Sequence, residues 1–263
     1  MGRIIAVAIP KGGVGKTTTA INLAIAFAQA GKKTLLIDLD PSGSCSSGLG
    51  YCNEDMSDDI FSVLQFNVSL EQATIQTEVE NLYFIPIRHL TFNDEQRLLK
   101  VSSNEHLLRN ILRPEAFSYD YIIIDCPPYL TGTTNSALIA ADSVLIPVLP
   151  GQFSLDAVTK LVEHLKILRL LHNLELKIEG ILLTMYEFNT KVSFAAKKEL
   201  FRKYPEHILI TAIPKNVTVG EASIKNKPLL IYQPNAKAAK AYTKLVTELS
   251  ERKDLFNLLE MSK

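Results

Sequence analysis

The chain has 263 residues, of which 47% are hydrophobic and 21% charged, and its formal net charge is zero. This is the composition of an ordinary globular protein with a sizeable core, and no stretch approaches the roughly 18 apolar residues of a membrane span. Three cysteines without a CxxC pair and five scattered histidines argue against a disulfide framework or structural zinc and favour a reducing cytoplasm.

The charges are distributed unevenly along the chain. Residues 51–110 contain 4 basic and 10 acidic residues, a net charge of −6, whereas residues 185–245 contain 11 and 4, a net charge of +7. The overall neutrality therefore hides a basic C-terminal half, which is a candidate surface for a polyanion.

Short apolar runs alternate with longer amphipathic stretches from one end of the chain to the other. We expect strands at 4–9, 33–39, 82–87, 121–126, 143–148, 178–184 and 208–213, and helices at 17–30, 94–112 (ended by Pro114), 155–171, 193–204 and 236–253. The strand runs are uniformly apolar, which is typical of strands covered on both faces. The pattern predicts an α/β fold with a doubly wound, mainly parallel sheet flanked by helices, in a single domain over 1–263.

Four polar clusters follow predicted strands: PKGGVGKTT, DLDPSGS, DCPP and IPKNVTVGEA. In open α/β sheets, ligands bind beyond the carboxyl ends of the strands. We therefore expect these four clusters to converge on one site.

The first cluster has the parts of a phosphate-binding loop, although Pro10 replaces the first glycine of the GxxxxGK[ST] pattern. Glycines allow backbone N–H groups to surround an anion, and the N-terminal end of the following helix faces it. Lys16 is predicted to reach the β- and γ-phosphates, Thr17 to bind Mg²⁺ and Thr18 to donate to the α-phosphate. The loop residues expected to contact the nucleotide are Lys11, Gly12, Gly13, Val14, Gly15, Lys16, Thr17 and Thr18.

The stretch KGGVGKTTTAINLA resembles the deviant phosphate loop of the ParA/MinD family of ATPases, which have the fold of P-loop NTPases. In that family the first glycine is not required, and a second, signature lysine stands at the position of Lys11. The resemblance implies that Lys11 reaches across an ATP-dependent homodimer to the partner's phosphates and neutralises charge in the transition state. It implies ATP and Mg²⁺ as cofactors.

Three carboxylates are predicted to lie in or beside the same site. YIIIDCPP is an apolar run followed by an acid, which is typical of a Walker B strand, so Asp125 is expected to reach Mg²⁺ through water. LLIDLDPSG resembles the first switch of the family, usually DxDPQGN, and this resemblance implies that Asp40 positions the attacking water. Asp38 is expected to support the Mg²⁺ shell or the loop. The sequence departs from the family pattern at Ser42 and Ser44.

The segment IPKNVTVGEASIKNKPLLIYQPNAKAAKAYTKLVTEL resembles the C-terminal signature of ParA/Soj proteins, with likeness extending from Ile4 to about Glu248. The match implies that Pro214 and Asn216 border the adenine.

The resemblance also implies an ATP-bound dimer that binds double-stranded DNA nonspecifically, a ParB-like protein that stimulates hydrolysis, and a cytoplasmic, nucleoid-associated location. The basic half fits such a contact with phosphates. At two positions where close relatives often have DNA-contacting arginines, this chain has Asn189 and Thr218, with Lys191 and Lys215 nearby. The candidate DNA-binding residues are Lys191, Lys197, Lys198, Arg202, Lys203, Lys215, Lys225 and Lys227.

Two other functions share this core chemistry. A MinD-like membrane-positioning ATPase needs a basic amphipathic tail, whereas the tail DLFNLLEMSK has Asp254 and Glu260 among its leucines, so no membrane partner is expected. A metabolic P-loop enzyme would need substrate-binding residues or paired cysteines, and neither is evident.

Overall fold

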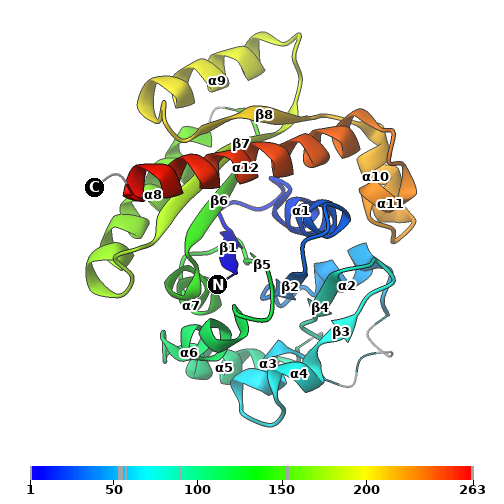
Figure 1. Cartoon of the computed structure of the whole chain (residues 1–263), viewed down its shortest axis with the longest axis vertical. Helices are drawn as coiled ribbons and strands as arrows, with labels where there is room; N and C mark the ends of the chain where they lie inside the picture. Colours follow the sequence, from blue (N-terminus) through cyan, green and yellow to red (C-terminus); the bar gives the residue numbers. More distant parts are fainter. Residues whose placement is uncertain (1, 53–55, 57, 89, 152–153, 262–263) are drawn as a thin grey trace.

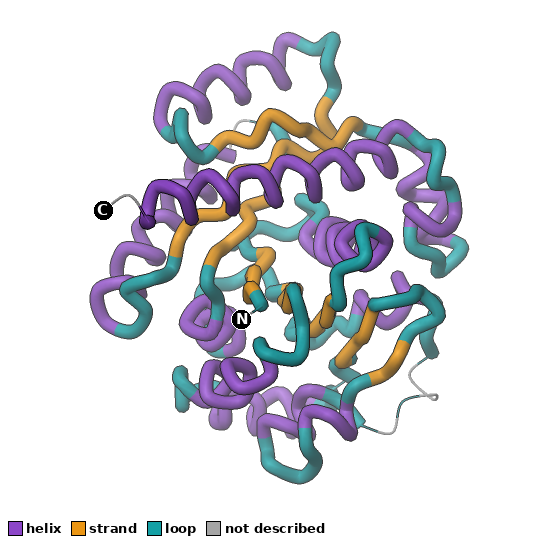
Figure 2. Tube along the Cα trace, in the orientation of Figure 1, coloured by secondary structure: helices purple, strands orange, loops and turns teal. Residues whose placement is uncertain are grey.

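The computed structural model describes residues 2–52, 56, 58–88, 90–151 and 154–261, without the side chains of 253–261. Its centre is an eight-stranded sheet in the order β3-β4-β2-β5-β1-β6-β7-β8 (Figures 1 and 2). All neighbouring strands are parallel except β3, which is antiparallel to β4. The strands are β1 (Arg3–Val7), β2 (Thr34–Asp38), β3 (Ile75–Gln76), β4 (Leu82–Ile85), β5 (Tyr121–Asp125), β6 (Ser143–Val148), β7 (Lys177–Tyr186) and β8 (Ile208–Pro214).

Helices cover both faces of this sheet, so the predicted doubly wound α/β architecture is confirmed. The helices are α1 (Lys16–Gln29), α2 (Ser44–Leu49), α3 (Ile60–Leu64), α4 (Leu70–Ala73), α5 (Phe92–Val101), α6 (Leu107–Glu115), α7 (Thr133–Ala140), α8 (Ser154–Leu171), α9 (Lys191–Lys203), α10 (Val217–Ile224), α11 (Leu229–Tyr232) and α12 (Lys237–Met261).

The alternation of side chains along the strands divides the core into two layers. Ile4 and Ala6 of β1 pack into one cluster with residues of α3 to α8, whereas Ile5 and Val7 pack into the other with α1 and α12. Both sets are fully buried, which explains why the strand sequences are uniformly apolar. Figure 1 shows α1 and α12 next to each other on one side of the sheet.

The centre of the sheet places its acidic strand ends side by side. Val7 of β1 is in register with Asp125 of β5, and Asp125 is in register with Asp38 of β2. Because these three strands are parallel and end together, the loops that follow them meet at one edge.

The prediction of one helix over 94–112 is wrong, because the structure has two helices there, α5 and α6. Polar residues 102–104 separate them, and the Ser103 hydroxyl donates to the Lys100 carbonyl oxygen over 2.7 Å, a local bond that competes with the helical pattern. Pro114 does not end the segment but lies inside the last turn of α6.

Candidate functional site

A loop with two left-handed glycines connects β1 to α1. Gly13 has φ 71° and Gly15 has φ 84°, and a Cβ atom in this region of φ would be strained. The Thr184 hydroxyl of β7 donates to the Val14 carbonyl oxygen over 2.8 Å and so fixes the middle of the loop. The backbone therefore curls at the N-terminus of α1, as an anion-binding loop requires.

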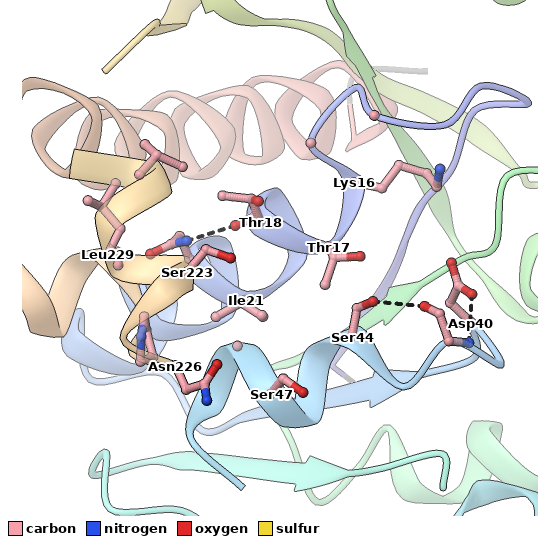
Figure 3. Close-up of a pocket in the computed structure, with 18 of the residues that line it drawn as sticks. Lys16, Thr17, Thr18, Ile21, Asp40, Ser44, Ser47, Ser223, Asn226 and Leu229 are labelled. Atoms are coloured by element: carbon pink, nitrogen blue, oxygen red, sulfur yellow. Dashed lines mark hydrogen bonds between the residues drawn. The ribbon is translucent and has the colours of Figure 1, made fainter. Parts of the chain in front are cut away.

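This loop forms one wall of a cleft of roughly 520 Å³. The other walls come from α1, the segment that follows β2, α2, and the region from α10 to α11 (Figure 3). The predicted loop residues that line the cleft are Gly12, Gly13, Gly15, Lys16, Thr17 and Thr18. Val14 and Lys11 do not line it. The Val14 side chain is buried in the core, and Lys11 is half-buried.

Lys16 is a buried cation inside the cleft, with only 7% of its surface exposed. Its ammonium group donates to the Lys11 carbonyl oxygen over 3.0 Å. Burial lowers the pKa of Lys16, while the charges of Asp125 and Asp40 act in the opposite direction. In such a site the lysine can bind a phosphate while the neighbouring carboxylates attract Mg²⁺.

Asp38 and Asp125 form a buried acidic pair with the thiol of Cys45. Asp38 accepts backbone hydrogen bonds from Asp40 and Cys45, each of 3.0 Å, while the Cys45 thiol donates to Asp125 over 3.5 Å. One ligand atom of each of the three residues lies within 4.8 Å of the others. Burial raises the pKa of Asp38 and of the Cys45 thiol well above their ordinary values. Asp38 thus shapes the loop that carries Asp40, and no sequence pattern indicates Cys45 as a neighbour of the two carboxylates.

Asp125 has the features of a carboxylate that can bind a cation. One of its oxygens, Oδ1, is buried without a hydrogen-bond partner among the described residues. Burial is the main cause that raises the pKa of Asp125 to about 7, and a hydrogen bond from the Thr17 side chain opposes it. A Mg²⁺ ion bound to the Thr17 hydroxyl, with Asp125 reached through water, would satisfy that oxygen. These residues therefore fit the predicted metal site.

Asp40 is half-buried and lines the cleft near the start of the loop after β2. Its Oδ1 accepts a hydrogen bond from the Ser42 backbone N–H over 3.0 Å, and the Ser42 and Ser44 hydroxyls lie 2.8 Å apart. Figure 3 shows Asp40 and Ser44 on the same side of the cleft as Lys16. The two serines at which the sequence departs from the family pattern thus hold this loop by local hydrogen bonds.

The wall opposite the loop is not formed by the two residues predicted to border the adenine but by residues that follow them in the chain. Pro214 and Asn216 do not line the cleft; the Asn216 side chain instead caps α10 by accepting from the Thr218 backbone N–H over 3.0 Å. Asn22 connects this wall to α1, since its side chain accepts from the Leu230 N–H and donates to the carbonyl oxygen of Thr18 in the first turn of α1. The wall residues that the sequence did not predict follow the predicted pair along the same motif: Val219, Ala222, Ser223, Asn226, Lys227, Pro228 and Leu229.

The predicted DNA-binding residues separate into two groups. Lys191, Lys197, Lys198, Arg202 and Lys203 lie on α9, and Lys215, Lys225 and Lys227 lie at the end of β8 and around α10 (Figure 1).

Three of these cations already interact with other side chains or line the cleft. The Lys215 ammonium pairs with Glu187 at 2.6 Å, Lys203 donates to Thr159 over 2.8 Å, and Lys227 lines the nucleotide cleft. Asn189 is exposed beside the start of α9 and Thr218 is half-buried in the first turn of α10, so neither supplies a positive charge.

A glycine loop between a central parallel strand and a helix, with a buried lysine and a carboxylate at the end of the neighbouring strand, defines a P-loop nucleotide-binding protein. The AAA domain family matches residues 2–178.

Among curated proteins, the chain is 37% identical to a chromosome partitioning protein ParA of Myxococcus xanthus, over 96% of this chain and 89% of that protein. It is also 37% identical to the sporulation initiation inhibitor protein Soj of Bacillus subtilis, over 95% and 99% of the two chains. The chain therefore belongs to the AAA domain family and, within it, to the ParA/Soj group of partitioning ATPases.

Solved structures share the whole fold. Cobyrinic acid a,c-diamide synthase from Mycobacterium smegmatis, with a bound ATP analog and magnesium, superposes with a TM-score of 0.82 at 27% identity, over 97% and 96% of the two chains. The septum site-determining protein MinD of Pyrococcus horikoshii, complexed with Mg-ADP, gives 0.81 at 27% identity, over 97% and 98%. No helix in the described part of the chain is long and apolar enough to cross a membrane.

Proposed function

We propose that this protein is an ATPase that dimerises when it binds ATP and Mg²⁺, binds double-stranded DNA nonspecifically as a dimer, and segregates or positions a cargo. The cargo is a plasmid, a chromosome origin or another assembly, recruited by a ParB-like protein that stimulates hydrolysis. Membership of the ParA/Soj group supports this proposal, as do the bound ligands of the two structural neighbours.

In this proposal the described residues have separate tasks in phosphoryl transfer. Lys16 and the loop N–H groups bind the β- and γ-phosphates, and Asp40 orients the attacking water from the edge of the cleft. Thr17 and Asp125 hold Mg²⁺, which supplies charge neutralisation on the phosphates. The bond that breaks is that between the β–γ bridging oxygen and the γ-phosphorus, so the products are ADP and phosphate.

The observation that carries the dimer proposal is the different placement of the two lysines of one loop. Lys16 occupies the cleft, whereas Lys11 contributes only its carbonyl oxygen to Lys16 and does not line the cleft of its own subunit. The Lys11 ammonium is therefore available to a second nucleotide site across a subunit interface. A cation supplied only on dimerisation would couple hydrolysis to assembly, as an arginine finger does.

A measurement of molar mass in solution tests this proposal directly. Size-exclusion chromatography with light scattering should give a monomer with ADP and a dimer with ATP and Mg²⁺, and the dimer should persist longest in an Asp40→Ala variant. A monomer with every nucleotide would overturn the dimer proposal while leaving nucleotide binding to be measured separately.

A second candidate function, positioning at a membrane, is favoured by one surface feature. Phe194 and Phe201 on α9 are 67% and 57% exposed, and they share the outer face of the helix with Lys198. Exposed aromatics among lysines are typical of helices that lie in an anionic membrane interface. Sedimentation with anionic vesicles, with and without ATP, tests it. The side chains of the tail 254–263, whose acidic residues argue against a MinD-like protein, lie outside the described residues.

We propose that the protein is cytoplasmic and that its ATP-bound dimer associates with the nucleoid through the basic residues near Lys191. Nonspecific binding of this kind depends on the release of counterions from DNA and weakens steeply with salt.

A further inference from the structure

Three of the chain's histidines lie in one polar cluster remote from the nucleotide cleft. His106 precedes α6, His172 follows α8, and His164 is on α8 itself. The His172 Nδ1 and His106 Nε2 atoms are 3.2 Å apart, and the two rings lie with their centroids 5.3 Å apart. Glu105 approaches the other nitrogen of His172, Nε2, at 3.3 Å.

We propose that His106 and His172 bind one divalent transition-metal ion, such as Zn²⁺, Ni²⁺ or Cu²⁺, through the two ring nitrogens that face each other. This inference goes beyond the proposed ATPase function, because none of the residues involved lines the nucleotide cleft.

The separation of the two nitrogens is the first argument. Zinc binds imidazole nitrogen at about 2.0–2.1 Å, so two nitrogens on one tetrahedral ion are about 3.3 Å apart. The observed 3.2 Å matches this spacing. Binding of a metal requires that both facing nitrogens offer a lone pair, with the proton of each ring on its other nitrogen.

Glu105 is the second argument, because it occupies the position of an outer-shell carboxylate. A histidine that binds a metal usually donates its other ring N–H to a carboxylate or carbonyl, which fixes its tautomer and orients its lone pair. Here Glu105 Oε2 lies 3.3 Å from His172 Nε2, where it can accept the N–H of that nitrogen, and this tautomer leaves the Nδ1 lone pair on the side of His106. Glu105 is itself held by Asn135, whose amide donates to it over 3.2 Å, and Asn135 in turn contacts His164 at 2.6 Å.

The backbone at both ligands is fixed, which is the third argument. The neighbour of His172, Asn173, is only 3% exposed, and its side-chain amide donates to the carbonyl oxygens of Leu138, Ile139 and Ala141. His106 is the N-cap of α6, and its carbonyl oxygen accepts from the Asn110 N–H over 3.0 Å. Metal binding therefore costs little conformational entropy.

The exposure and ligand type of the pair define the kind of ion. His106 is exposed and the side chain of His172 is 25% exposed, so the ion is reached from solvent and water completes its coordination. Imidazole nitrogen favours zinc, nickel and copper, whereas Mg²⁺ prefers oxygen, so excess Mg²⁺ does not compete. A bound ion would join the start of α6 to the end of α8.

Titration calorimetry with Ni²⁺ in excess Mg²⁺ tests the proposal. The chain is used without an affinity tag, without nucleotide, and with Cys52→Ser to remove the exposed thiol. We expect one Ni²⁺ per chain, at least tenfold weaker binding for His106→Ala and His172→Ala, and about tenfold weaker binding for Glu105→Gln, which keeps both ligands. His207→Ala serves as the matched control and should bind as the parent does.

The melting temperature without metal shows whether each variant is folded, and Ni²⁺ should raise it in the parent but not in the histidine variants. If a variant to alanine does not fold, His172→Gln takes its place. The proposal is overturned if the parent shows no saturable binding, or if the two histidine variants bind Ni²⁺ as tightly as the parent.

Discussion

The Lys16 ammonium donates a hydrogen bond to the Lys11 carbonyl oxygen over 3.0 Å, so the backbone of one lysine orients the side chain of the other. Lys16 enters the cleft, and Lys11 leaves its side chain outside it. Replacing each of the two lysines is therefore expected to impair a different step, nucleotide binding for Lys16 and hydrolysis for Lys11.

Lys16→Ala should abolish nucleotide binding, because it removes the buried cation that faces the phosphates. Lys11→Ala should leave ATP binding by the monomer within about threefold of the parent but reduce hydrolysis by about 10³-fold or more, by analogy with the removal of a finger cation. Fluorescent ATP titration and phosphate release measure the two effects. Equal hydrolysis by Lys11→Ala and the parent would refute the assignment of Lys11.

Asp40→Ala should bind ATP with little change and hydrolyse it slowly. The reason is that the Asp40 side chain bonds within its own loop, to Ser42, and lines the cleft without any bond to the glycine loop among the described residues. Single-turnover hydrolysis with protein in excess over nucleotide isolates the chemical step. A large decrease in ATP affinity with normal turnover would mean that Asp40 binds the nucleotide instead of positioning water.

The sequence predicted the sheet and the phosphate loop well because both depend on local patterns. Uniform apolar runs mark buried strands, and GKTT after a strand marks the loop. The break between α5 and α6 depends on hydrogen bonds of residues 102–104, which outweigh a continuous helical pattern. The wall around Asn226 and the thiol of Cys45 beside Asp125 could not be predicted, because contacts between segments so far apart in the chain arise only from tertiary packing.

Lys191→Ala combined with Lys215→Ala should weaken DNA binding and reduce the salt slope by up to about 0.9 for each phosphate that the protein no longer neutralises. Glu187→Gln should strengthen binding, because the ion pair with Glu187 at 2.6 Å neutralises Lys215. Lys244→Ala, an exposed lysine of α12, is the matched control. Unchanged affinity and salt slope in the double variant would remove both lysines from the DNA surface.

The stability of the protein without Mg²⁺ and nucleotide should fall as the pH rises from about 4 to about 7. Burial raises the pKa of Asp125 to about 7, well above that of an aspartate in the unfolded chain. Between about pH 4 and pH 7 the folded state therefore binds a proton that the unfolded state has released, so raising the pH favours unfolding. Urea unfolding at several pH values should show a smaller decline for Asp125→Asn. An equal decline in both proteins would contradict this cause.

Gly180→Ala should destabilise the protein by about 1–3 kcal/mol, because a Cβ at Gly180 would lie 2.6 Å from side-chain carbons of Leu209 on β8. Gly220→Ala is the matched control, since nothing lies within 4 Å of its added Cβ and alanine favours the helix that contains it. Thermal unfolding should rank Gly180→Ala below the parent and Gly220→Ala at or above it; the reverse order would contradict the packing of β7 on β8.

Fluorescence anisotropy of a nonspecific DNA duplex most directly tests the proposed nucleotide-gated DNA tether. The protein is titrated in ATP with Mg²⁺, in ADP and without nucleotide, each across a series of salt concentrations. We expect binding only with ATP, and a steep decrease in affinity as salt increases. Absence of binding in all three conditions, or the same affinity in each, would contradict the proposed function.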